Sequence, residues 1–119
     1  MKNLELLREN NIGVDKAVVT LGSNELYDEV LNDFYEENLR RVAKLVEFKN
    51  KNDLQNYSIL VHAMKSEAEY LGMHNFSQLC ALHQKKSQEN DVEFIINNFD
   101  NFMRELQKLF DVMKKYLEK

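Results

Sequence analysis

The absence of proline is the feature that most constrains this chain of 119 residues. Proline breaks helices, and glycine, which weakens them, occurs only three times, while 30% of the residues are charged and 44% are apolar. This composition favours long helices joined by short turns. The length suffices for one domain with a real core and not for two, so we expect a single domain over residues 1–119, centred on about 10–110.

Apolar residues recur every three or four positions in four long segments, which is the period of an amphipathic helix. These segments run from Ser23 to about Lys49 and over 53–72, 76–87 and 90–116, and two short helical segments precede them, at 3–10 and from Asp15 to Gly22. Asp15 can cap the second short segment. Residues suited to helix N-caps precede the long segments: Ser23 or Asn24, Asp53, Asn75 with Gln78, and Asn90 with Glu93. The predicted fold class is all-α, an antiparallel four-helix bundle with short extra N-terminal helices across one end.

Charge and apolar runs narrow the class of partners. The formal charge is −4, and no block of Lys and Arg is present, so we expect no nucleic-acid partner. No apolar run is long enough to cross a bilayer, and the N-terminal MKNLELLREN lacks the apolar core of a signal peptide. The single cysteine, Cys80, excludes an internal disulfide and fits a reducing compartment. These observations predict a cytoplasmic protein without a membrane partner.

The segment 53–72 carries two different stripes. Its core stripe has spacings of three and four: Leu54, Tyr57, Val61, Met64, Ala68 and Leu71. At about 100° per residue, His62 lies roughly 130° from the centre of that stripe and therefore points outward. The other outward residues are uncharged and half of them apolar, which suits docking against another protein: Ile59, Ser66, Tyr70 and Met73. Tyr70 and Met73 could equally belong to the core, and a lone exposed histidine usually has no special role.

The residues HAMKSEAEYLG, 62–72, resemble the signature of histidine-containing phosphotransfer domains, which reads roughly H-x-aliphatic-K-G-x-small-x-x-aliphatic-G. The histidine, aliphatic, lysine, small and glycine positions are matched by His62, Met64, Lys65, Ala68, Leu71 and Gly72. The stretches FSQLCALHQ and GVDKAVVTLGSNELYDEVLNDF resemble flanking helices of that family, so the resemblance covers about Asn10 to Leu109.

The resemblance implies a phosphorelay intermediate of a two-component system. His62 would accept a phosphoryl group from the aspartate of a response-regulator receiver domain and pass it to another receiver, and Lys65 would offset the phosphate charge. A neutral imidazole is a competent nucleophile near neutral pH. No cofactor is implied for this chain, because Mg²⁺ would belong to the partner receiver. The expected protein is a monomer without its own ATP site, hence not an enzyme, and a hybrid histidine kinase is a further candidate partner.

Two positions depart from the family pattern. Ser66 stands where the family has glycine, and Glu69 stands where it has a small residue, so both bear on whether transfer occurs. The alternative is a degenerate domain that docks a receiver or another regulator without transfer, through Ile59, Ser66, Glu69, Tyr70 and Met73. A purely structural bundle is the third reading.

The other histidines and the cysteine carry weaker expectations. We expect His74 in a turn or cap, His83 packed or facing solvent, and Cys80 as a small buried hydrophobe. The Glu-x-x-His pairs of di-iron bundles and the His-Glu-x-x-His motif are absent, so no metal site is predicted.

Overall fold

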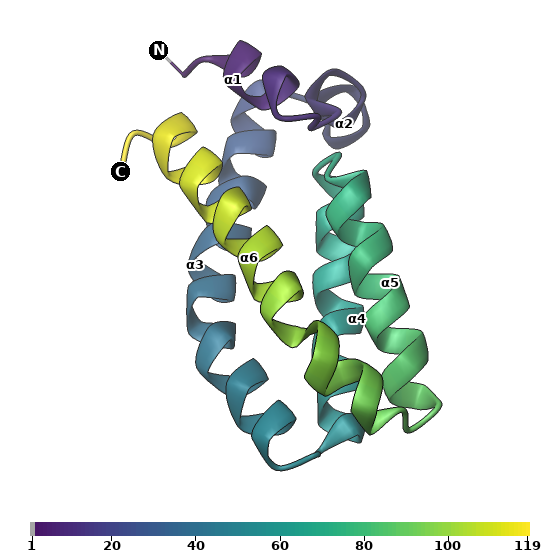
Figure 1. Ribbon diagram of the computed structural model, residues 1–119. Coiled ribbons are helices and arrows are strands. Elements are labelled where there is room, and N and C mark those ends of the chain that lie inside the picture. The colour runs from purple at the N-terminus through teal and green to yellow at the C-terminus, as the bar shows by residue number, and fades with distance from the viewer. Residues whose placement is uncertain (1) are drawn as a thin grey trace.

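A computed structural model describes residues 2–119, and within that range the chain forms six helices and no strand (Figure 1). The all-helical fold class predicted from composition and periodicity is confirmed. The helices are α1 (Leu4–Glu9), α2 (Val14–Leu21), α3 (Asn24–Asn50), α4 (Leu54–Tyr70), α5 (His74–Gln88) and α6 (Val92–Tyr116).

The four long helices enclose the core. Helix α4 packs along α5 and against α3, while α6 contacts both α3 and α5 (Figure 1). The short helices α1 and α2 lie across one end, where α1 contacts α6 and α2 contacts α3. The side of α4 that is turned away from these contacts remains available to solvent.

Two helix starts follow the sequence prediction. The Ser23 hydroxyl accepts a hydrogen bond from the backbone N–H of Leu26 at 3.1 Å, and α3 begins at the next residue. The Asp53 carboxylate accepts from the N–H of Asn56 at 3.3 Å and caps α4. Both side chains satisfy N–H groups that have no partner within the helix.

Three predicted caps are wrong. Asp15 lies in the first turn of α2, whose N-cap is Gly13. Helix α5 starts earlier than predicted, with Met73 as an N-cap that makes no side-chain capping bond, so Asn75 lies inside the helix. Asn90 takes a left-handed φ of 57° that closes the preceding turn, and the capping role passes to Asp91, whose carboxylate accepts from the N–H of Phe94 at 3.0 Å.

The predicted core stripe of α4 is buried throughout: Leu54, Tyr57, Val61, Met64, Ala68 and Leu71. Cys80, on α5, is also buried as predicted. Burial of each large apolar side chain stabilises the fold by about 1.5–3 kcal/mol. This stripe therefore fixes the rotation of α4 about its axis and decides which of its residues face outward.

The turn after α4 is tied to the residues just before α2 and to α3. Gly72 has a φ of +82°, and its carbonyl accepts a hydrogen bond from the N–H of Gly13 at 2.9 Å. A Cβ atom on Gly72 would lie 2.5 Å from the carbonyl oxygen of Gly13, so no other residue fits without movement. The phenol of Tyr27, on α3, donates to the carbonyl of Leu71 at 2.8 Å and fixes the same turn.

No helix among residues 2–119 combines the length and the apolar character needed to span a bilayer.

Candidate functional site

The outward side of α4 presents four residues to solvent, and we call them the α4 outer face: Ile59, His62, Ser66 and Tyr70. All four are exposed, and the side chains of Ile59 and Tyr70 are each 62% exposed. The outward position predicted from helical spacing is therefore confirmed for these four. These four side chains carry no fixed charge, and the exposed carboxylate of Glu69 borders them at the end of the helix.

Met73 was predicted on the same outward stripe, and this prediction is wrong. The residue is only 2% exposed and belongs to the core. Helix α4 ends at Tyr70, and the left-handed Gly72 turns the chain back, so an angle extrapolated at 100° per residue no longer applies. The backbone N–H of Met73 donates to the carbonyl of Ala68 at 2.9 Å, which directs the side chain inward at the start of α5.

His62 lies beside α5. Its Nδ1 atom is 3.2 Å from the side-chain oxygen of Gln84, within hydrogen-bond distance. Lys65, one turn further on, is half-buried and makes no ion pair with any residue in 2–119. The hydroxyl of Ser77 donates to the backbone carbonyl of Lys65 at 3.3 Å, so this part of α4 is tied to α5.

Glu69 faces the turn and not His62. Its Oε1 atom lies 2.8 Å from Nδ1 of His74, the first residue of α5. Together with Ser66, Tyr70 and Lys16, these two residues line a hollow of about 430 Å³ between α2 and the end of α4, which we call the α2–α4 groove. Glu69 and Ser66 thus line one hollow, and the Glu69 carboxylate contacts His74.

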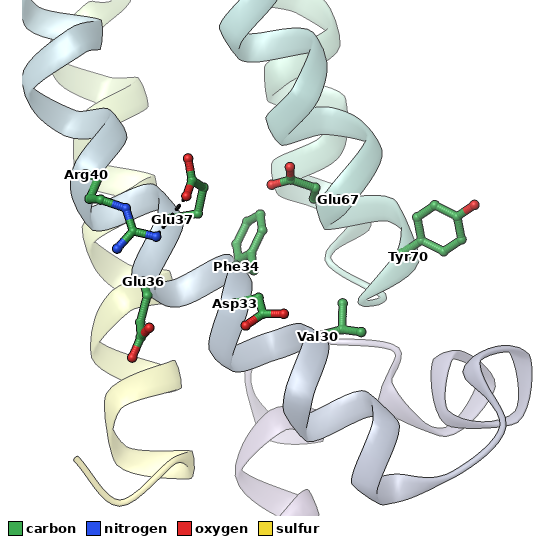
Figure 2. A pocket seen from close by; sticks show the side chains of 8 residues that line it. All are labelled: Val30, Asp33, Phe34, Glu36, Glu37, Arg40, Glu67 and Tyr70. Atoms are coloured by element: carbon green, nitrogen blue, oxygen red, sulfur yellow. Dashed lines mark hydrogen bonds and ion pairs between the residues drawn. The ribbon is translucent and has the colours of Figure 1, made fainter.

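A second hollow, of about 360 Å³, lies on the other side of Tyr70, and we call it the α3–α4 groove. Figure 2 shows Glu37 of α3 and Glu67 of α4 on opposite sides of it, with Phe34 between them and Tyr70 at the outer end. The full lining comprises Val30, Asp33, Phe34, Glu36, Glu37, Arg40, Glu67 and Tyr70.

Ion pairs organise the inner part of the α3–α4 groove. Arg41 binds Glu67 with two hydrogen bonds, of 2.6 and 3.0 Å, and thereby joins α3 to α4. Arg40 donates to Glu37 at 2.9 Å, and this hydrogen bond holds the pKa of the Glu37 carboxyl below its usual range. The bidentate geometry fixes the position of the Glu67 carboxylate on the groove wall.

Sequence reasoning missed the residues that α3 contributes to this groove. Val30 and Phe34 belong to the apolar pattern of the segment from Ser23 to about Lys49, which does not single them out, and Asp33 and Glu37 were not considered. The contact of α3 with α4 places these residues in one hollow with Tyr70, and helical periodicity within one segment does not specify such a contact.

Metal and thiol chemistry find no support among residues 2–119. No group of three or more His, Cys, Asp or Glu side chains comes together there in a way that could hold a metal ion. Burial raises the pKa of the Cys80 thiol, so the sulfur is held in its unreactive protonated form.

The comparisons with known proteins give one finding. The family model described as "PML-like, coiled-coil" matches residues 8–118, almost the whole chain. No curated protein and no solved structure matches the chain.

The family match overturns the identification as a histidine-containing phosphotransfer domain. The predicted phosphorelay function and the predicted place in a two-component system are therefore wrong as well. The quoted signature owed much of its agreement to packing positions. Met64, Ala68 and Leu71 are buried, and a small or aliphatic residue at such spacing is what any amphipathic helix presents to a core. The glycine at 72 is required by its positive φ and its contact with Gly13, for structural reasons alone.

The chemical roles of His62 and Lys65 depended on that resemblance alone, and so did receiver domains as partners. Neither has any other support. What remains is a long-helix protein with an uncharged exposed face on α4, flanked by two grooves that share Tyr70. The chain belongs to the PML-like coiled-coil family.

Proposed function

We propose that this chain is a protein-binding module, not an enzyme, and that it docks a partner protein on the α4 outer face. The observation that carries the proposal is the pair Ile59 and Tyr70, each 62% exposed on one side of a single helix. Large exposed apolar side chains on a common face are typical of protein interaction sites.

The spacing of these residues suits a protein partner. Eleven positions separate Ile59 from Tyr70, which corresponds to about 16 Å along the helix at about 1.5 Å per residue. His62 and Ser66, between them, offer hydrogen-bonding groups without a fixed charge that would have to be desolvated. Tyrosine is among the residues that dominate interface energies, because its ring is large and loses few degrees of freedom.

We further propose the arrangement behind this surface. The four long helices would form an antiparallel bundle within a single monomeric domain, with α1 and α2 closing one end and α4 presented outward. The family's description as a coiled coil and the side-by-side packing of α3 and α6 support such a long-helix framework. A cytoplasmic location is supported by the free, buried thiol of Cys80.

The test uses two isoleucines on different helices. A photo-crosslinking amino acid replaces Ile59 in one sample and Ile96, on α6 and 49% exposed, in the other. A protein crosslinked only from position 59 is then purified, and its dissociation constant is measured against Ile59→Asp and the matched control Ile96→Asp.

We expect Ile59→Asp to raise the dissociation constant at least about tenfold, because removal of an interface anchor costs more than about 1.4 kcal/mol. Ile96→Asp should leave it unchanged, and neither exposed substitution should shift the free energy of unfolding by more than about 0.5 kcal/mol. Equal effects of the two substitutions on binding would show that the α4 outer face is not the docking surface.

A further inference from the structure

The α3–α4 groove has an apolar floor and an acidic rim. Phe34 is buried at its base and Val30 is half-buried beside it. Four of the eight lining residues carry carboxylates, and Arg40 is the one cation among them. The groove is therefore negative overall and still offers carbon surface to an occupant.

Most of these carboxylates already have cationic partners. Glu37 is bonded to Arg40, and Glu67 is bonded to Arg41. Glu36 accepts from the ammonium of Lys119 at 3.1 Å. Asp33 differs from them, because it is exposed and forms neither an ion pair nor a side-chain hydrogen bond with any residue in 2–119.

Tyr70 connects this groove to the α4 outer face, since it belongs to both. Its ring is exposed, and Figure 2 shows it extending outward at the end of α4, beyond Glu67. The Tyr70 ring and the open Asp33 carboxylate line the same groove. A long basic side chain could use both, because a guanidinium or ammonium group is attracted by an aromatic ring and by a carboxylate.

From this arrangement we infer that the α3–α4 groove binds an Arg or Lys side chain of the protein that docks on the α4 outer face. The inference rests on the proposed function and adds the partner's chemistry to it. The cationic head lies at Asp33, and the methylene stem lies over Val30 and Phe34 and beside the ring of Tyr70. The docked segment is thus apolar where it meets Ile59 and basic where it meets Tyr70.

This charge pattern defines a probe. An amphipathic helical peptide of Leu and Arg, with one apolar face bordered by Arg, reproduces the expected partner surface. A matched peptide has Glu in place of every Arg. Binding is measured by fluorescence anisotropy of the labelled peptides at constant ionic strength with the full chain. The key variant is Asp33→Lys, and its control is Asp100→Lys, which changes the net charge equally at an exposed position on α6.

We expect the Arg peptide to bind the unmodified chain and the Glu peptide not to bind. Asp33→Lys should weaken binding of the Arg peptide about tenfold more than Asp100→Lys does, because it replaces a local attraction by a repulsion. Raising the salt concentration should narrow that difference.

Other results overturn the inference. It fails if Asp33→Lys and Asp100→Lys weaken binding equally, since the peptide then senses only net charge, and it fails if the Glu peptide binds as well as the Arg peptide. Displacement of the Arg peptide by Ca²⁺ at constant ionic strength would make the groove a metal site instead.

The proposed function fails separately. If Asp33→Lys weakens binding of the Arg peptide but Ile59→Asp does not, the groove binds cations independently of the α4 outer face. If a partner found through Ile59 binds Asp33→Lys and Asp100→Lys equally, docking on α4 stands and the cationic contact is wrong.

Discussion

His83 makes the stability of this protein sensitive to acid. The imidazole is fully buried on α5, with its ring centroid 4.6 Å from that of Phe102 and 5.5 Å from that of Phe94. Its Nδ1 atom lies 2.8 Å from the hydroxyl of Tyr57, and Nε2 has no hydrogen-bond partner within residues 2–119. A positive charge at this position would lie among aromatic rings and away from water, so burial lowers the pKa of His83 from 6.5 to about 4.

The change in the free energy of unfolding with pH depends on whether the folded or the unfolded state binds the proton more tightly. Since the folded state has the lower pKa, the unfolded state takes up the proton first as the pH falls. The contribution of neutral His83 is fully present above about pH 6.5 and is lost as the pH falls towards about 4. The full loss is about 3 kcal/mol, at about 1.36 kcal/mol per pKa unit, and about 2 kcal/mol of it disappears between pH 7 and about pH 4.5.

The assay is urea unfolding followed by far-ultraviolet circular dichroism, because the chain has no tryptophan for fluorescence. The reference variant is His83→Gln, whose amide can still pair with the hydroxyl of Tyr57 but does not titrate. Carboxylates with lowered pKa values, such as Glu37 and Glu47, destabilise both proteins equally on acidification and cancel in the comparison.

We expect the free energy of unfolding of the unmodified chain to fall about 2 kcal/mol more than that of His83→Gln between pH 7 and about pH 4.5. His62→Gln removes an exposed histidine and should keep the steep profile. If the profiles of the unmodified chain and His83→Gln run parallel, His83 is not buried in the neutral form and the reasoning is refuted.

Three further predictions concern the framework. Gly72→Ala should lower the free energy of unfolding by at least about 2 kcal/mol, because Gly72 has a positive φ and a close contact with Gly13. Gly13→Ala, whose added Cβ atom makes only ordinary contacts, should lower it by less than about 1 kcal/mol. Similar losses for the two variants in urea unfolding would contradict this prediction. Tyr27→Phe should cost about 1 kcal/mol in the same assay through loss of its buried hydrogen bond, and no loss would mean the bond is not formed. A double-mutant cycle on Arg41 and Glu67 should give a coupling energy of about 1 kcal/mol that declines with salt, and a value near zero would show that the pair does not join α3 to α4.

The sequence predicted those features of the fold that depend on one helix at a time. The period of three and four assigned the buried residues of α4 and the outward positions of Ile59 and Tyr70 correctly, because both faces belong to one regular element. Ser23 and Asp53 were found as caps for the same reason, since a cap interacts with its own helix. The caps predicted at Asp15, Asn75 and Asn90 were wrong by one or two residues, because periodicity locates a helix more closely than its first residue. Met73 was misplaced because the helix had already ended.

Features that depend on pairs of helices were not predictable in the same way. The α3–α4 groove exists because α3 and α4 pack so that Asp33, Phe34 and Tyr70 line one hollow, and no periodicity within either segment requires that arrangement. The family assignment failed for a related reason. Residues 62–72 match a short motif largely through core positions and one glycine that the turn requires. The match therefore reflects helix packing more than a chemical role of these residues.

The most direct test of docking on α4 is a map of the bound surface. Backbone amide resonances of the ¹⁵N-labelled chain are followed by NMR while the partner crosslinked from position 59 is added to saturation. Docking on α4 predicts that the largest shifts lie between Ile59 and Tyr70 and in the adjoining part of α3 around Asp33, with little change around Ile96 on α6. Shifts centred on α6, with α4 unaffected, would contradict it.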